Sequence, residues 1–120
     1  MQRDLAVYLI DIQQCLEELA IFVKGKTLSD YQHETMLHRA IEREFTIIGE
    51  VMRRILHHFP ECAARIEDAR KIADFRNVIV HEYHLLDDAK IWGIATNAAP
   101  VLKQQIDLWL KELDQARRSP

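Results

Sequence analysis

The chain is poor in the residues that build turns, covalent cross-links and metal knuckles. Its 120 residues include three glycines, three prolines and two cysteines. So few turn formers disfavour a sandwich or barrel of many short strands. Cys15 and Cys62 are isolated, without a Cys-x-x-Cys spacing. The sequence therefore indicates neither a disulfide framework nor a zinc knuckle, and it fits a reducing, cytoplasmic location.

Long apolar runs and a basic excess are also missing. No apolar segment approaches the roughly 18 residues that a membrane span needs, and the N-terminus lacks the pattern of a signal peptide. With 19 acidic against 16 basic side chains the formal net charge is −3, which argues against a broad electrostatic nucleic-acid binder. No internal repeat or composition break is present, so a single domain over residues 1–120 is expected.

Helical periodicity dominates what is present. Apolar residues recur at spacings of three and four over residues 5–23, which predicts an amphipathic helix. Gly25 is expected to end that helix with a positive φ. Ser29 and Gln32 resemble a capping box, so a second helix is expected from Ser29 to the residue before Pro60, about 28 residues long.

Gly49 lies inside this long helix, where a glycine costs about 1 kcal/mol relative to alanine. Two interpretations are possible: tolerated variation, or the close approach of another backbone. The second is favoured, because the chain has so few glycines.

The C-terminal half continues the helical pattern. Residues 61–83 are expected to be helical, more weakly at first, because the strand candidate at 78–80 has no second strand to pair with. Asp87 is expected to cap a short helix, and Asn97 the last helix, with Pro100 in its first turn. The last helix is expected to bury five apolar residues: Val101, Leu102, Ile106, Trp109 and Leu113. Four or five helices with short links predict an all-α antiparallel bundle.

Two polar stripes cross the otherwise apolar segment 74–84. At about 100° per residue, one stripe carries four polar side chains: Asp74, Asn77, His81 and His84. Arg76 and Tyr83 lie on a neighbouring stripe. Buried polar groups need partners or a cleft, so the pattern is either a hydrogen-bonded seam that fixes register with a second subunit or a functional site.

These side chains suit phosphodiester chemistry on RNA. Arginine offers a permanently charged fork for phosphate oxygens, and histidine titrates near neutral pH. We expect Arg76 to stabilise the pentavalent transition state while His81 moves protons at the 2′-hydroxyl or the leaving oxygen, with no metal or other cofactor. Positions 76 and 81 point roughly 140° apart on one helix. Two copies facing each other across a two-fold axis would assemble the site more easily.

The run Arg76-Asn77-Val78-Ile79-Val80-His81-Glu82-Tyr83 resembles the Arg-x4-His-x-Tyr motif of HEPN-domain toxins, specifically the HepT-like branch. Ile47-Ile48-Gly49-Glu50 matches the Ile-Gly-Glu segment of that family, and the resemblance covers nearly the whole chain. It implies a homodimeric, HEPN-like helical bundle that acts as the ribonuclease toxin of a type II or VII-like toxin–antitoxin system. Arg76 and His81 of both protomers would be catalytic in a shared cleft. Three polar neighbours would support the site or orient the substrate: Asp74, Asn77 and His84.

The resemblance also implies a partner, a minimal nucleotidyltransferase antitoxin encoded beside the toxin. In this branch the antitoxin neutralises by transferring AMP to the motif tyrosine, here Tyr83. An adenylylated Tyr83 beside Arg76 would place phosphate and base where RNA should lie, and so block the cleft.

Other interpretations stay open. The chain could be a non-catalytic HEPN subunit that binds a nucleotide or substrate for a nucleotidyltransferase, although such proteins generally lack the complete Arg-x4-His pair. It could also be a dimerisation bundle whose polar seam only sets register. A metal site is not favoured, because His81 and His84 are three apart, one short of the zinc-binding His-Glu-x-x-His spacing. The basic cluster Arg53-Arg54 with His57-His58 is an ordinary solvated face unless it folds beside the cleft.

Overall fold

The computed structural model describes residues 4–81 and 87–118, apart from the side chain of His81. Within these ranges the chain is mainly helical and has no β-strand, which confirms the all-α prediction. Four long helices form the body: α1 (Leu5–Val23), α3 (Thr35–His58), α4 (Ala69–His81) and α6 (Ala99–Arg118). The shorter elements are α2 (Leu28–His33), a 3-10 helix (Pro60–Arg65), α5 (Asp88–Gly93) and a π-helical turn (Ile94–Ala98).

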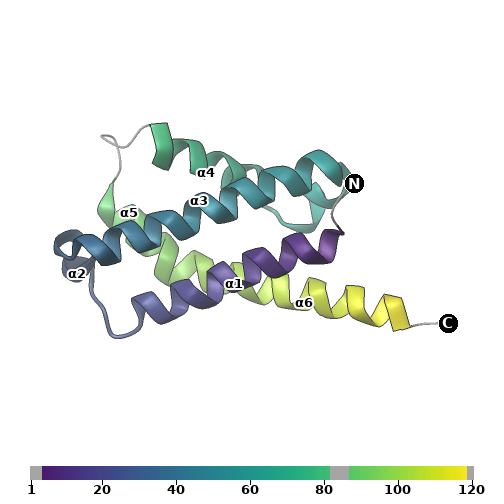
Figure 1. The fold of residues 1–120 in the computed structure, drawn as a ribbon, viewed down its shortest axis with the longest axis horizontal. Coiled ribbons are helices and arrows are strands. Elements are labelled where there is room, and N and C mark those ends of the chain that lie inside the picture. Colours follow the sequence, from purple (N-terminus) through teal and green to yellow (C-terminus); the bar gives the residue numbers. More distant parts are fainter. Residues whose placement is uncertain (1–3, 82–86, 119–120) are drawn as a thin grey trace.

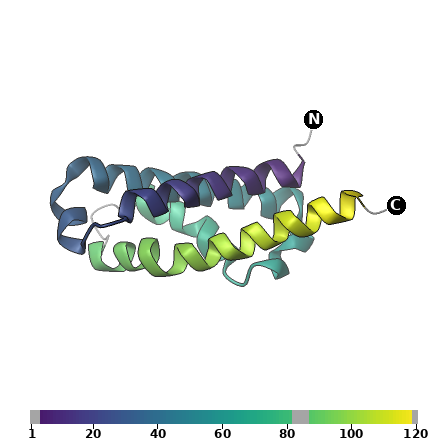
Figure 2. The same cartoon turned by 90° about the horizontal axis from the view of Figure 1, so that it is seen from below.

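The long helices lie roughly along the longest dimension of the molecule, which measures 53 × 29 × 24 Å (Figure 1). α1 contacts both α3 and α6, and α4 packs along α3, to which it runs antiparallel. Figure 2 shows α6 running beside α1. None of the described helices is both long and apolar enough to cross a bilayer.

The first helix matches its prediction. α1 ends at Val23, and Gly25 has a φ of 72°, the left-handed conformation that glycine adopts without strain. One stripe of α1 is buried: Tyr8, Leu9, Ile12, Cys15, Leu16 and Leu19. The apolar spacing therefore identified the face that packs on α3 and α6.

The capping box expected at Ser29 and Gln32 is wrong. The hydroxyl of Thr27 accepts a hydrogen bond from the backbone N–H of Asp30 at 3.2 Å, and the Asp30 carboxylate accepts one from the N–H of Thr27 at 2.9 Å. This reciprocal pair starts α2 one residue before Ser29. Both pairs share the three-residue spacing that defines a capping box, and spacing alone did not distinguish them.

The single long helix expected up to Pro60 is also wrong, because Glu34 is extended (φ −93°, ψ 100°) and separates α2 from α3. The break lets Tyr31 point into the core, where it is fully buried and stacks on His38. The ring of Trp92 lies 5.8 Å from the Tyr31 ring on another side. Tertiary packing of one aromatic side chain therefore overrides local helix propensity.

The segment between α3 and α4 departs from the expected weak helix. A 3-10 helix is followed by Ile66, which is extended and buried, and α4 begins only at Ala69. Residues 78–80 are helical, as predicted. Asp87 caps α5 as predicted, because its carboxylate accepts hydrogen bonds from the N–H groups of Ala89 and Lys90.

Asn97 does not cap the last helix. α5 continues through the π-helical turn into α6, and the residues that flank the turn, Gly93 and Ala99, are both right-handed helical. Pro100 has no N–H to donate to the carbonyl of Thr96, and a widened turn is a common way to accommodate such a gap. Val101, expected to be buried, is 56% exposed. The other four apolar residues of α6 are buried or partly buried: Leu102, Ile106, Trp109 and Leu113.

Candidate active site

α4 carries the polar residues expected to do chemistry. The helix starts after the buried Ile66, whose carbonyl accepts the N–H of Ala69 at 3.1 Å, and it ends at His81. The backbone of His81 is therefore placed at the C-terminal end of α4. Its side chain, and all of Tyr83 and His84, lie outside the described residues.

The position of α4 is fixed by a close contact at Gly49 of α3. A Cβ atom on Gly49 would lie 2.6 Å from the Cβ of Arg76, 3.0 Å from the carbonyl oxygen of Ile72 and 3.2 Å from the backbone nitrogen of Arg76. Real Cβ atoms do not approach other carbons so closely. The favoured interpretation of Gly49 is confirmed, and the backbone it admits is that of Arg76 itself.

Arg76 is half-buried, and its guanidinium is directed toward the polar side of α4. Its Nη1 donates a hydrogen bond to Oδ1 of the exposed Asn77 at 3.1 Å. Its Nε is buried and has no hydrogen-bond partner among the described residues. An arginine cannot give up its charge, so a partly buried guanidinium with a free N–H is well suited to meet an anion.

Asp74 is exposed, and it forms no hydrogen bond or ion pair with the described part of the chain. It lies on the same polar side of α4 as Asn77, three residues away. The structure thus brings Arg76 and Asn77 into contact and leaves Asp74 as a neighbour.

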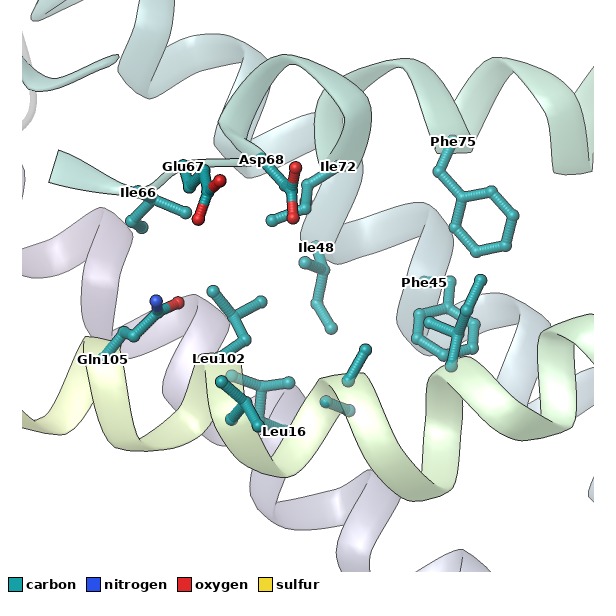
Figure 3. Close-up of a pocket in the computed structure, with 14 residues that line it drawn as sticks. Leu16, Phe45, Ile48, Ile66, Glu67, Asp68, Ile72, Phe75, Leu102 and Gln105 are labelled. Carbon is teal, nitrogen blue, oxygen red and sulfur yellow. The ribbon is translucent and has the colours of Figure 1, made fainter. Parts of the chain in front are cut away.

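The opposite side of α4 is apolar and borders a cavity of about 320 Å³ (Figure 3). Phe75 and Asn77 are two residues apart, which is about 200° around a helix, so the cavity and the Arg76–Asn77 pair lie on different sides of α4. Five apolar side chains from four helices border the cavity: Leu16, Phe45, Ile48, Ile72 and Leu102. Glu67, Asp68 and Gln105 are the polar residues that border it. No candidate catalytic residue lines this cavity.

Thiol and metal chemistry have no support in the described residues. Burial, with the nearby Glu44, raises the pKa of the Cys15 thiol to about 12, so the reactive thiolate is not populated near neutral pH. Burial also raises the pKa of Cys62. Among the side chains that the structure places, no three His, Cys, Asp or Glu converge as metal ligands would.

Arg53 is a residue whose position the sequence alone did not reveal. It follows Gly49 by four residues on α3, one helical turn along, and it therefore flanks the contact with α4. The relevant signal was the spacing from Gly49, but it has meaning only once Gly49 is known to touch Arg76.

Comparisons with known proteins agree with this arrangement. The family model described as "Ribonuclease HepT-like" matches residues 12–108. "Gamma-glutamylcyclotransferase and putative RNase MJ0434" of Methanocaldococcus jannaschii is 27% identical over 119 residues, which is 99% of this chain and 53% of that protein. This chain thus spans about half the length of that relative.

Two shorter relatives match over most of their length. "Putative RNase TTE0752" of Caldanaerobacter subterraneus subsp. tengcongensis is 31% identical over 99 residues, 82% of this chain and 88% of that protein. "Probable ribonuclease HepT" of Thermococcus cleftensis is 26% identical over 107 residues, 89% of this chain and 96% of that protein. No solved structure matches the chain. The family model and these relatives together establish that the chain belongs to the HepT-like ribonuclease family.

Proposed function

We propose that this HepT-like chain is an endoribonuclease toxin that cuts RNA without a metal ion, in a cleft formed by Arg76 and His81 of two copies. The single observation that carries the proposal is the state of Arg76. Its backbone is anchored against Gly49, its Nε is buried without a partner, and its Nη1 reaches the polar side of α4.

The chemistry follows from these two residue types. The 2′-oxygen attacks the adjacent phosphorus and the bond to the 5′-oxygen breaks, which leaves a cyclic phosphate and a free 5′-hydroxyl. His81 takes the proton of the 2′-hydroxyl or gives one to the leaving oxygen, and Arg76 stabilises the charge on the phosphorane. Asn77 holds the guanidinium of Arg76 in place through its Oδ1. Asp74 and His84 are proposed to help orient the substrate.

Two copies are proposed because one helix separates the two groups. Positions 76 and 81 lie about 140° apart around α4. A partner copy related by a two-fold axis would bring a second Arg76 and a second His81 to the same phosphate. The homodimer is thus part of the proposed site.

Cleavage of a labelled RNA by the purified protein in EDTA tests this function. Arg76→Ala and His81→Ala should each slow cleavage by about a hundredfold or more. The matched controls Arg117→Ala and His33→Ala change an exposed arginine and an exposed histidine in other helices, and they should cleave like the wild type. Full activity of both α4 variants would rule out the assignment, and loss of wild-type cleavage in EDTA would indicate a metal mechanism instead.

We further propose that a nucleotidyltransferase antitoxin silences the site by adenylylating Tyr83. The phenolic oxygen of Tyr83 would attack the α-phosphorus of ATP, with loss of pyrophosphate and of the phenolic proton. The bound AMP would add a negative charge and a base next to Arg76 and exclude RNA.

Intact-mass analysis after co-expression with the adjacent nucleotidyltransferase tests the modification. The wild-type chain should gain the mass of AMP units, and Tyr83→Phe should gain none. Peptide mapping excludes the other tyrosines, since Tyr8 and Tyr31 are buried. An unmodified wild-type chain beside an active transferase, or a modified Tyr83→Phe chain, would contradict the proposal.

A further inference from the structure

We infer that the exposed side of α3 beside Arg76 binds the phosphodiester backbone of single-stranded RNA. The binding surface is a basic patch made of Arg53, Arg54 and His57. It rests on the proposed function, since the patch would hold the strand whose scissile phosphate meets Arg76. It adds a second phosphate site, outside the Arg-x4-His motif.

The geometry places the patch next to the candidate active site. Gly49 touches Arg76, and Arg53 is four residues further along α3, about 6 Å along the helix axis. The turn from Gly49 to Arg53 carries the side chain about 40° around α3, away from Phe45, which borders the apolar cavity. The patch therefore lies on the same side of the α3–α4 pair as Asn77, to which the Arg76 guanidinium is bonded.

The patch is a shallow hollow of about 240 Å³ lined by Arg53, Arg54 and His57 alone. All three residues are exposed. Two guanidinium groups and an imidazole supply hydrogen-bond donors from adjacent turns of one helix, with no apolar side chain between them. This composition suits an anion and gives an apolar ligand nothing to contact.

The charges of the patch are not neutralised within the described chain. Arg53 forms no ion pair or hydrogen bond with any described residue, and Arg54 has only the partly exposed Glu50, with Nη2 and Oε1 3.4 Å apart. An exposed pair of this kind contributes little and can be displaced by a phosphate. By contrast, Arg117 pairs with Asp4, and Arg118 with Asp114. Arginines at the C-terminal end of α6 thus have acidic partners, whereas Arg53 does not.

The net charge of the chain makes such a patch necessary for substrate binding. At −3 per chain the protein repels RNA over most of its surface. One arginine beside the scissile phosphate gives little affinity, because backbone binding grows with the number of phosphates contacted. Arg53 and Arg54 add two contacts within reach of the same strand.

Fluorescence anisotropy of a labelled, 2′-O-methylated single-stranded RNA tests the patch, because this probe has no free 2′-hydroxyl and cannot be cut. The double variant Arg53→Ala/Arg54→Ala should bind roughly tenfold more weakly than the wild type. A plot of log K against log salt should lose about 1.4 from its slope, about 0.7 for each phosphate contact. Arg53→Lys/Arg54→Lys should keep most of the slope.

The matched control is Arg117→Ala/Arg118→Ala, which removes the same charge from α6, where both arginines are exposed and paired. It should leave affinity and slope close to those of the wild type. Thermal unfolding should be alike for both double variants, since all four side chains are exposed.

The outcomes separate the patch from the proposed function. If the wild type binds the probe and the Arg53/Arg54 variant binds equally well, the patch is rejected while cleavage at Arg76 and His81 stands. If the variant loses binding but the wild type cuts no RNA, the patch stands and the ribonuclease proposal fails. Equal losses in both double variants would show non-specific charge attraction and reject the patch. A wild type that binds no RNA, or a patch that binds only an acidic protein, would also reject it.

Discussion

Helix α3 packs against two neighbours, and each of these two seams buries one charged side chain. Glu44 lies in the seam with α1 and is 6% exposed. Arg76 reaches the other seam from α4 and is half-buried. Each has one buried atom without a hydrogen-bond partner in the described chain, Oε2 of Glu44 and Nε of Arg76. The two seams therefore pose the same energetic problem, and they solve it differently.

Glu44 can lose its charge. Burial raises the pKa of its carboxyl from 4.5 to about 7, and a hydrogen bond with Glu18 of α1 raises it further toward that value. The side chain is thus largely protonated at mildly acidic pH and can sit among apolar residues at low cost. This seam needs no ligand to be stable.

Arg76 has no such option, because a guanidinium stays charged at any physiological pH. Its burial is only partial, and its Nη1 is held outward by Asn77. The remaining N–H groups must meet water or an anion. The comparison teaches that burial of a charge marks a binding site only where the group cannot be neutralised by a proton.

The largest expected effect comes from breaking the α3–α4 seam with Gly49→Val. The new Cβ alone would lie 2.6 Å from the Cβ of Arg76, and the branched side chain would force α4 away from α3. We expect the free energy of unfolding to fall by roughly 3 kcal/mol, at the upper end of the usual cost of overpacking. Urea unfolding followed by circular dichroism measures it.

Gly93→Ala is the matched control for Gly49→Val. Gly93 is also helical, but a Cβ there would meet nothing within 4 Å. Alanine should therefore raise stability by up to about 1 kcal/mol through its helix propensity. If Gly49→Val is as stable as the wild type, α4 is not seated on α3 at Gly49 and the account of Arg76 is wrong.

Local patterns predicted the parts of the fold that local physics controls. The buried stripe of α1, the positive φ of Gly25 and the Asp87 cap all follow from residues close in sequence. The break at Glu34 and the π-helical turn before Pro100 do not, because Tyr31 packing and a wide helical turn depend on distant elements.

The candidate site shows the same division. The sequence singled out Arg76, Asn77 and Gly49, and the structure joins all three through one contact and one hydrogen bond. Arg53 was visible only as part of a charged cluster, since no pattern within one helix shows which turn of α3 faces α4. The roles of His81, Tyr83 and His84 stay predictions, as does the second copy.

A smaller effect sharpens the comparison from the α1 side. In wild type the folded pKa of Glu44, about 7, exceeds its ordinary value of 4.5. The folded state therefore binds more protons than the unfolded state between these values, and stability falls as pH rises through this window. Glu44→Gln keeps the size and removes the charge. The variant should lose this pH dependence and, above pH 7, exceed the wild type by on the order of 2 kcal/mol.

The test compares urea unfolding of Glu44→Gln and the wild type across that pH range. Glu50→Gln is the control on the same helix, where the carboxylate is 38% exposed and faces Arg54. Its removal should leave the slope of stability against pH unchanged, because a hydrated carboxylate needs no proton to be tolerated. If Glu44→Gln keeps the wild-type slope, the carboxyl does not take up a proton on folding. Glu44 would then be a buried charge like Arg76, and the distinction drawn between the two seams of α3 would fall.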